Sequence, residues 1–475
     1  METNLVLLKK ELGQSPQFVF RYYTKNLCLV YNRGFANENI INRDILPHLS
    51  LIFQGELEPY QIPVAEVIKT SNLEQVAQEI SKGYTALIQD NSIDLYLFNT
   101  KGLEKRAVIE PPTERTTRGS RAGFIEDLET NISLVRSTLN TPALTVEYFT
   151  IGELASTKGA ILFLDNVATP DIVNEVRHRL KNIKVDNILA TGEIENHIED
   201  HPWSLFPQAF GTEKPNKVAA NLAEGRVAIM LNGTPYVLLV PALFVQFFQG
   251  VEDYFDRFWV ANYARVLRFA GLVLAMTITP TYIALVTYHH DLLPFSLLLS
   301  IAEIRREVPF PPIIEALIIE TILEMLREAG LRLPNPLGQT LGVVGGIVLG
   351  QAIISAKIVS PLIIIVVTIS AVASFMIPNY SASLGIRLVK YPLMLLAATF
   401  GAFGIAVGLI LFITHQASME SFGVPYMAPL APTRLRDVGD SILVSHTWKM
   451  KNRPASIPHQ KDQRIADSLQ EHRQK

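Results

Sequence analysis

The sequence predicts a multidomain protein, with a soluble α/β region of two lobes in its N-terminal half and a polytopic α-helical membrane domain in its C-terminal half. Three observations support this fold class. Charged residues recur steadily up to Glu224, four long uncharged runs follow Leu267, and one strand–helix pattern occurs twice in the first half. In addition, the mean hydropathy of +0.23 is high for a wholly soluble chain.

The predicted segments follow from these changes in composition. In chain order they are a first α/β lobe (1–110), an inter-lobe linker with a helix (111–143), a second α/β lobe (144–225), a hairpin and junction (226–265), a transmembrane domain of four to six helices (266–420) and a polar C-terminal tail (421–475).

The strand–helix pattern identifies the two lobes. Leu27–Tyr31 is a β-rich run, and the helical stretch Glu38–Leu46 follows it after a turn and should end at Pro47. Ala160–Leu164 repeats the strand, and Pro170–Asn182 repeats the helix. Each unit is typical of a strand–helix element in an α/β lobe.

The junction reads as a hairpin rather than as a membrane span, because Gly233, Pro235 and Pro241 interrupt its apolar run. Val227–Leu231 and Thr234–Val240 are the expected strands, joined by Asn232-Gly233 in a type I′ turn. The following Phe244–Phe248 is expected to form a short helix at the membrane interface.

Four uncharged runs are each long enough for a helix to cross about 30 Å of hydrocarbon. They are Phe269–Tyr288, Leu337–Ala356, Ile358–Ile386 and Tyr391–Thr414. Leu292–Ala302 is too short to cross unaided, so four to six spans are expected. The tail after Thr414 is polar, and Ser441–Lys475 lacks apolar periodicity, which predicts a surface-following and then disordered segment.

Basic residues near the spans predict sidedness. Arg265 and Arg268 precede the first run, and the tail carries several Arg and Lys residues, so both ends are expected in the cytoplasm. Arg387 and Lys390, which lie between the last two runs, would then face the opposite side, against the positive-inside rule.

Charges with a candidate functional role occur in two segments. Three acidic residues fall on one face of a helical stretch: Glu320, Glu324 and Glu328. They form either the solvated face of an interfacial helix or an acidic vestibule of a cation path. In the linker, Arg118, Arg121 and Arg136 are candidates for contacts between the lobes or between subunits. The alternative is a solvated loop.

The run Leu337–Ala356 is the candidate pore helix. Glycines recur every fourth residue and would let a neighbouring helix pack closely: Gly338, Gly342, Gly346 and Gly350. The opposite face mixes polar residues with valine and would line a pore: Thr340, Val344, Val348, Gln351 and Ser355. The alternative is an ordinary packed helix whose polar residues bond to neighbouring helices.

Chemistry-bearing motifs give no sign of an enzyme. No nucleophile elbow, P-loop, zinc-ligand spacing or kinase signature occurs, and no cofactor is expected. The net charge of −3 predicts no nucleic-acid partner. Cys28 is the single cysteine, which excludes an intramolecular disulfide.

Several ordered motifs, spread over about residues 20 to 455, resemble the A subunits of GerA-type spore germinant receptors. The resemblance lies in Arg226-Val227-Ala228 with Asn232-Gly233-Thr234-Pro235, in Pro311–Ala316 and in the linker run Arg118–Phe124. A sporulation-stage paralogue of the A subunit shares most of these motifs. Ser120 and Ala122 depart from the family's usual proline and glutamate, which leaves the roles of those two positions open.

The resemblance implies a nutrient receptor subunit in the spore inner membrane. It also implies a homo-oligomer, a transporter-like B subunit and a lipoprotein C subunit as partners, membrane lipid around the helices, and an ion path that opens to start germination. Two alternatives remain at this point: a secondary transporter and a non-conducting membrane scaffold.

Overall fold

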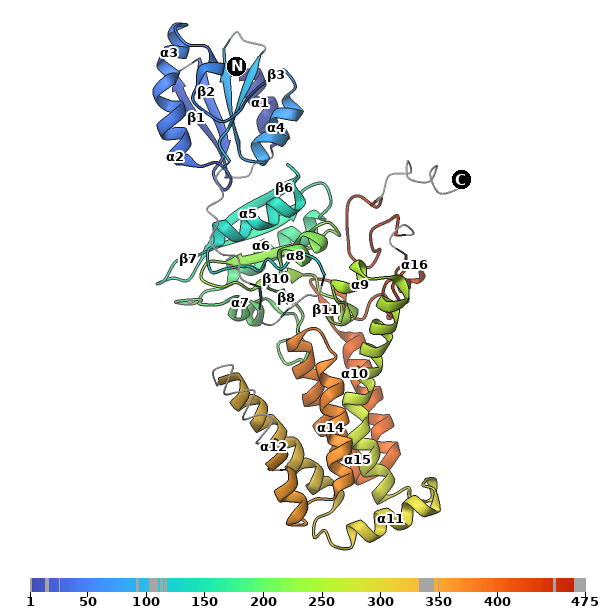
Figure 1. Ribbon diagram of the computed structural model, residues 1–475. Coiled ribbons are helices and arrows are strands. Elements are labelled where there is room, and N and C mark those ends of the chain that lie inside the picture. Colours follow the sequence, from blue (N-terminus) through green and yellow to red (C-terminus); the bar gives the residue numbers. More distant parts are fainter. Residues whose placement is uncertain are drawn as a thin grey trace.

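The structure is a computed structural model that describes residues 2–12, 17–24, 26–90, 94–101, 110–111, 114, 118–332, 346–348, 350–446 and 450–464. Two five-stranded sheets with helices on both faces lie one above the other, and a bundle of long helices lies below them (Figure 1). The predicted fold class, with a two-lobed α/β region and a C-terminal region of apolar helices, is therefore confirmed.

The first sheet has the strand order β1-β2-β4-β5-β3, with every neighbouring pair antiparallel. Its strands are β1 (Phe18–Thr24), β2 (Leu27–Asn32), β3 (Val67–Thr70), β4 (Tyr84–Gln89) and β5 (Leu95–Asn99). Its helices are α1 (Glu2–Glu11), α2 (Glu38–Ile40), the π-helical η1 (Ile41–Ile45), the 3₁₀ turns η2 (Leu46–His48) and η3 (Pro59–Gln61), α3 (Leu49–Gln54) and α4 (Leu73–Ser81).

The second sheet has the order β6-β7-β9-β10-β8, again antiparallel throughout. Its strands are β6 (Leu144–Ile151), β7 (Thr157–Leu164), β8 (Phe210–Thr212), β9 (Val227–Leu231) and β10 (Val237–Val240). Its helices are α5 (Leu128–Leu139), α6 (Pro170–Asn182), α7 (Thr191–Ile198) and α8 (Pro215–Leu222).

The two lobes are copies of one topology, because the second order becomes the first when five is subtracted from each strand number. Alternate residues of each buried strand face opposite sides of its sheet. In β2, Cys28 and Val30 join the core beneath α1 and α4, whereas Leu27 and Leu29 join the core beneath η1 and α3. In the second lobe, α5 and α8 cover one face and α6 and α7 the other.

Two boundaries differ from those expected from the sequence. The helical stretch at Glu38 continues beyond Pro47, because this proline lies in the first turn of η2, where its missing N–H is not needed. The helix that we assigned to the linker, α5, packs on the second sheet in the place that α1 has on the first. We therefore propose that the second lobe begins near Phe124.

The expected hairpin is present, and it belongs to the second lobe. β9 lies between β7 and β10, and Leu238 is paired with Ile229 across the hairpin. The loop is longer than the expected two residues because β10 begins only at Val237. The 3₁₀ helix η4 (Phe244–Phe248) is buried against Phe210 and Tyr426, rather than exposed at a membrane interface.

The helical region has five labelled helices among the described residues. These are α10 (Phe258–Thr287), α11 (Phe295–Arg305), α12 (Pro312–Arg332), α14 (Pro361–Phe375) and α15 (Tyr380–Ser418). Among the described residues, α10 and α15 are the helices that are long and apolar enough to cross a membrane by length and composition, and Gly346–Ser355 and α14 are shorter apolar helices. The short α9 (Glu252–Phe255) precedes α10, and the 3₁₀ turn η5 (His290–Leu292) follows it.

α15 is two antiparallel helices joined at Gly401. This glycine has φ +61° and ψ −142°, a conformation that other residues avoid. Beyond it the chain returns, so Gly404 lies against Leu396 and Gly408 against Leu393. His289, at the end of α10, accepts a hydrogen bond from Ala402 N (3.1 Å) and marks this as the end of the bundle farthest from the lobes.

The boundaries of the last two spans are therefore corrected. The run Ile358–Ile386 is divided between α14 and the start of α15, because Pro378 follows α14 and Asn379 caps α15. Arg387 and Lys390 lie inside the first half of α15 and are buried, rather than in a loop. Their charges thus give no information on the sidedness of a loop.

The tail returns to the lobes. β11 (Glu420–Ser421) and β12 (Val424–Pro425) form a small hairpin, and α16 (Leu435–Val438) follows them. Tyr426 and Ile457 are buried, and Gln460 N donates to Val167 O (2.8 Å). The expectation of disorder is wrong for residues 441–446 and 450–464, and residues 465–475 lie outside the described part.

Candidate functional site at the junction of the second lobe and the helices

Charged side chains on α12 face the other long helices rather than water. Glu320 Oε2 lies 2.6 Å from Lys390 Nζ of α15, and each side chain is 3% exposed. Ser370 of α14 contacts the same ammonium group at 3.3 Å, and Thr279 of α10 donates to Glu320 at 3.5 Å. Four helices therefore meet at one buried ion pair.

A second group of charges lies one turn nearer the lobes. Glu324 accepts hydrogen bonds from Arg327 (2.7 Å) on its own helix and from Arg387 (3.0 Å) on α15. Two guanidinium groups thus share one carboxylate, which leaves a net positive charge. Arg327 also lies over the ring of Phe375, with the guanidinium carbon 4.9 Å from the ring centroid.

The far end of α12 carries a second buried carboxylate. Glu315 is fully buried, pairs with Arg305 of α11 at 3.0 Å and accepts a hydrogen bond from Ser360 N at 2.8 Å. Ser360 is the N-cap of α14. A carboxylate at this position satisfies a free helix N–H and interacts favourably with the helix dipole.

The acidic vestibule predicted from the sequence thus divides into two kinds of residue. Glu320 and Glu324 are engaged by basic partners within the chain. Among the described residues, Glu328 pairs with Arg332 of its own helix, and its side chain is 60% exposed. Sequence reasoning missed Glu315 and the role of Lys390. A charge within an apolar run was the available signal, since such charges usually need a buried partner.

A further ion-pair network anchors the beginning of α10. Asp253 of α9 accepts from Arg265 (3.0 Å) and Arg268 (2.7 Å), while Asp440 of the tail also accepts from Arg265 (2.9 Å). Tyr254 donates to Asp440 at 3.0 Å. Burial, and next the nearby Asp440 charge, raise the pKa of the Tyr254 hydroxyl well above its usual range. The network ties α9, the start of α10 and the tail together.

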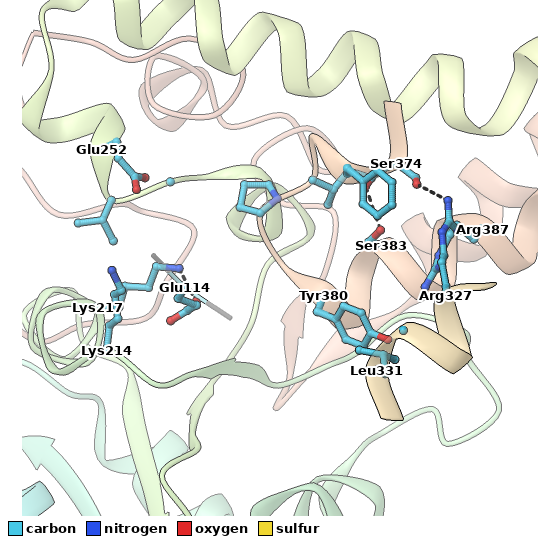
Figure 2. Close-up of a pocket in the computed structure, with 16 residues that line it drawn as sticks. Glu114, Lys214, Lys217, Glu252, Arg327, Leu331, Ser374, Tyr380, Ser383 and Arg387 are labelled. Atoms are coloured by element: carbon cyan, nitrogen blue, oxygen red, sulfur yellow. Dashed lines mark hydrogen bonds and ion pairs between the residues drawn. The ribbon is translucent and has the colours of Figure 1, made fainter. Parts of the chain in front are cut away.

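A cavity of about 540 Å³ separates the second lobe from the helices (Figure 2). Glu114, Lys214 and Lys217 lie on its lobe side, and Arg327 and Arg387 lie on its bundle side. Lys217 pairs with Glu114 at 2.7 Å. The cavity is therefore lined on one side by the soluble region and on the other by charged residues of α12 and α15.

The three linker arginines have different environments. Arg136 is buried and donates to Gln17 of the first lobe (2.9 Å) and to Leu144 O (3.3 Å). Burial lowers the pKa of its guanidinium to about 10. Arg118 pairs with Asp256 at the start of the helical region (3.2 Å). Arg121 is exposed and makes no hydrogen bond or ion pair with the described residues.

Part of the candidate pore helix lies outside the described residues, namely Gly338, Thr340, Gly342 and Val344. Of the remaining positions, Val348 is 59% exposed, and Gln351 and Ser355 are also exposed. A side chain added at Gly346 or Gly350 would meet no described atom within 4 Å. The glycine face therefore packs against no described helix of this chain.

No group of three or more metal-binding side chains occurs within the described ranges. His289, one of two adjacent histidines near the end of α10, has a structural role, because its ring accepts a hydrogen bond from the backbone N–H of Ala402. The arrangement as a whole provides buried ion pairs, a charged cavity and an exposed apolar helix.

Comparison with known proteins relates this arrangement to one family. Residues 6–456 match the family described as Bacillus/Clostridium GerA spore germination protein. Spore germination protein KA of Bacillus subtilis (strain 168) is 36% identical over 468 residues, covering 96% of this chain and 86% of the relative. The membrane protein YfkQ of the same organism is 38% identical over 463 residues, covering 95% and 90%.

One solved structure is also similar, the N-terminal domain of the A subunit of the Bacillus megaterium spore germinant receptor GerK3. It is 29% identical and superposes with a TM-score of 0.37, covering 52% of this chain and 96% of that domain.

Proposed function

This chain belongs to the GerA family of spore germination proteins, and we propose that it is an A-type subunit of a nutrient receptor that oligomerises into a ligand-gated ion channel. The membrane-protein relative supports insertion of the helical region into a membrane, and so do the long apolar helix α10 and the apolar helix α15, which folds back on itself at Gly401. We propose the spore inner membrane as its location.

One observation carries the channel proposal, the exposure of the helix Gly346–Ser355. Its apolar side chains Ile347, Val348 and Ile354 and its polar side chains Gln351 and Ser355 are all exposed in the single chain. Lipid satisfies apolar side chains but not polar ones, so the polar face requires protein or water. Copies of this helix around an axis would meet both needs, with glycine between neighbours and the mixed face toward the pore.

The arrangement of the ends supports a topology with both soluble parts on one side. α10 begins beside the second lobe, and the tail after α15 returns to that lobe, where Gln460 N donates to Val167 O (2.8 Å). We propose the cytoplasm as that side. Protease added to sealed right-side-out and inverted vesicles tests this, since the lobes should be cut only when their own face is exposed.

Ion flux through the purified chain in liposomes tests conduction. A channel subunit should release a trapped cation at a rate that a pore-helix variant changes. A scaffold should give no flux in correctly assembled particles, and a secondary transporter should instead need a substrate gradient. Co-purification from sporulating cells tests the proposed partners, a transporter-like B subunit and a lipoprotein C subunit.

A further inference from the structure

The cavity between the second lobe and the bundle has an excess of basic side chains over acidic ones. Its lining includes four basic residues and two acidic ones, the latter being Glu114 and Glu252. Glu114 is already engaged by Lys217. Across the cavity, Glu324 is the single carboxylate that Arg327 and Arg387 share. The site therefore attracts an anion.

A second and independent observation concerns Arg387. Its side chain is nine-tenths buried, and its Nε has no hydrogen-bond partner among the described residues. A buried guanidinium N–H without an acceptor costs free energy, so an absent acceptor is the simplest explanation. Figure 2 shows this side chain beside Arg327 on the bundle side of the cavity. Planar guanidinium groups suit oxyanions because they can donate two parallel hydrogen bonds.

The size, the apolar walls and the position of the cavity restrict further the class of ligand that it could bind. About 540 Å³ is far more than one water needs. Leu331, Phe375 and Pro378 add apolar walls beside the arginines. The cavity lies at the lobe-facing ends of α12 and α14, the level at which lipid headgroups lie if the bundle is inserted as proposed. Basic pockets at helix ends are suited to phosphate headgroups.

We propose that this cavity binds a phosphate-bearing ligand through Arg387 and Arg327, with Lys214 on the opposite wall. The phosphate chemistry is shared by phospholipid headgroups and by free phosphate esters. Because the ligand would contact both the second lobe and the helices, its binding links the two parts of the chain. The proposal uses the proposed membrane insertion only for the lipid source and is independent of ion conduction.

The test uses the full chain purified in a neutral detergent. Two probes are added separately: glycerol 3-phosphate, with matched chloride as its control, and vesicles of phosphatidylglycerol in phosphatidylcholine, with pure phosphatidylcholine as theirs. Melting temperature and retained lipid by native mass spectrometry are measured. A shift with glycerol 3-phosphate supports the free source, and a shift with phosphatidylglycerol alone supports the lipid source. If neither probe shifts the melting temperature more than its control does, the proposal is overturned.

Two variants connect the shift to the cavity. The double change Glu324→Gln with Arg387→Gln removes a carboxylate and a guanidinium together, so the change in net charge is zero. Gly330→Trp fills the cavity without touching a charge, since Gly330 lines it and an added Cβ would have no described atom within 4 Å. Gly192→Trp, at an exposed position of α7, is the matched control.

Each cavity variant should weaken the apparent affinity at least tenfold for whichever of the two probes binds the unaltered chain. The control variant should leave that affinity unchanged. If the double variant fails to fold, Gly330→Trp decides alone. Undiminished binding in folded Gly330→Trp places the phosphate elsewhere and contradicts the proposal. Loss of ion flux with intact phosphate binding would count against the channel function only.

Discussion

Lys390 Nζ lies 2.6 Å from Glu320 Oε2, although the two residues are 70 positions apart in the chain. Both are enclosed where α10, α12, α14 and α15 meet. Taking either charge out of water alone would cost several kcal/mol, so each charge is tolerated because of the other. The pair therefore fixes the register of α12 against α15.

The first prediction concerns this pair. Glu320→Gln should lower the free energy of unfolding by about 3–5 kcal/mol, because it leaves the Lys390 ammonium buried without its counter-charge. Replacing both residues, Glu320→Leu with Lys390→Met, should recover most of that loss. Thermal unfolding in detergent, followed by intrinsic fluorescence, measures both effects.

Glu328→Gln is the matched control for the first prediction. It lies on the same helix and pairs with Arg332, but both side chains are exposed. Exposed pairs contribute about 0–1 kcal/mol, so little change is expected. Equal losses at positions 320 and 328, or a double variant as unstable as the single one, would contradict a buried structural pair.

The second prediction concerns the proposed acidic vestibule. Because Glu320 and Glu324 are neutralised by basic partners, Glu328 is the member of the set best placed to attract cations from solution. Glu328→Gln should reduce cation flux at low ionic strength, with the difference disappearing near 1 M salt, where the Debye length is about 3 Å. Flux that is unchanged at every salt concentration would remove Glu328 from the ion path.

The third prediction separates contacts within the chain from contacts between chains. Arg136→Ala removes the hydrogen bonds to Gln17 and Leu144 and should cost about 1–3 kcal/mol. Amide hydrogen exchange of β1 should rise because this strand follows Gln17 directly. Exchange in β1 that matches the unaltered chain would mean that Arg136 does not hold the lobes together.

Arg121→Glu is the counterpart of that experiment. Arg121 is exposed and has no recorded partner among the described residues, so β1 exchange should not change. If this residue contacts a neighbouring subunit, reversing its charge should reduce the size of the complex on gel filtration. A complex of unchanged size would assign Arg121 to solvent.

The fourth prediction is a pH dependence in the second lobe. Burial, and secondly the charge of Glu199, raise the pKa of Glu195 from 4.5 to about 8. The folded state thus favours the protonated carboxyl, so the stabilisation is fully present below pH 4.5 and is lost as pH rises through about 8.

Glu195→Gln mimics the protonated form and should stabilise the chain at pH 8.5, with little effect at pH 4.5. Melting temperatures at the two pH values measure this difference. Glu153→Gln, an exposed change in the same lobe, should have no effect at either pH. A shift in Glu195→Gln that is independent of pH would show that the carboxyl titrates normally.

How much of the fold could be predicted depended on the range of the interactions that determine it. The strand at Ala160 and the helix Pro170–Asn182 follow from local patterns, and the helix has the predicted bounds. The repeated strand–helix unit correctly indicated two related lobes. The insertion of β9 and β10 into the second sheet could not be read locally, because it depends on pairing with β7, about 70 residues earlier.

The helical region was harder for the same reason. The reversal of α15 requires a positive φ at Gly401, and that glycine stands in an apolar run containing two other glycines between Tyr391 and Thr414. Composition alone does not distinguish the turn from a continuous span. Likewise, Lys390 was visible as a charge near apolar runs, but only the folded arrangement identifies Glu320 as its partner.

The last prediction tests the helix Gly346–Ser355. Gly346 and Gly350 meet no described atom of their own chain, so a bulky side chain there has room in the monomer. Gly346→Leu should therefore leave the stability of the single chain within about 0.5 kcal/mol of its original value, as for a surface change. In an assembly packed through glycine the same side chain should clash, and the oligomer should dissociate. Crosslinking in detergent measures this separately from folding.

Val348→Ala is the complementary change on the opposite face. Val348 is exposed in the single chain, and in the proposed ring it joins Val344 at an apolar constriction that closes by dewetting. Removing two methyl groups per subunit should widen this constriction and leak ions without nutrient, in complexes of normal size. Assembled Val348→Ala without leak would assign the gate to another helix, and assembled Gly346→Leu would mean that the subunits meet through another face. Loss of assembly in one variant and leak in the other require both faces to act as proposed.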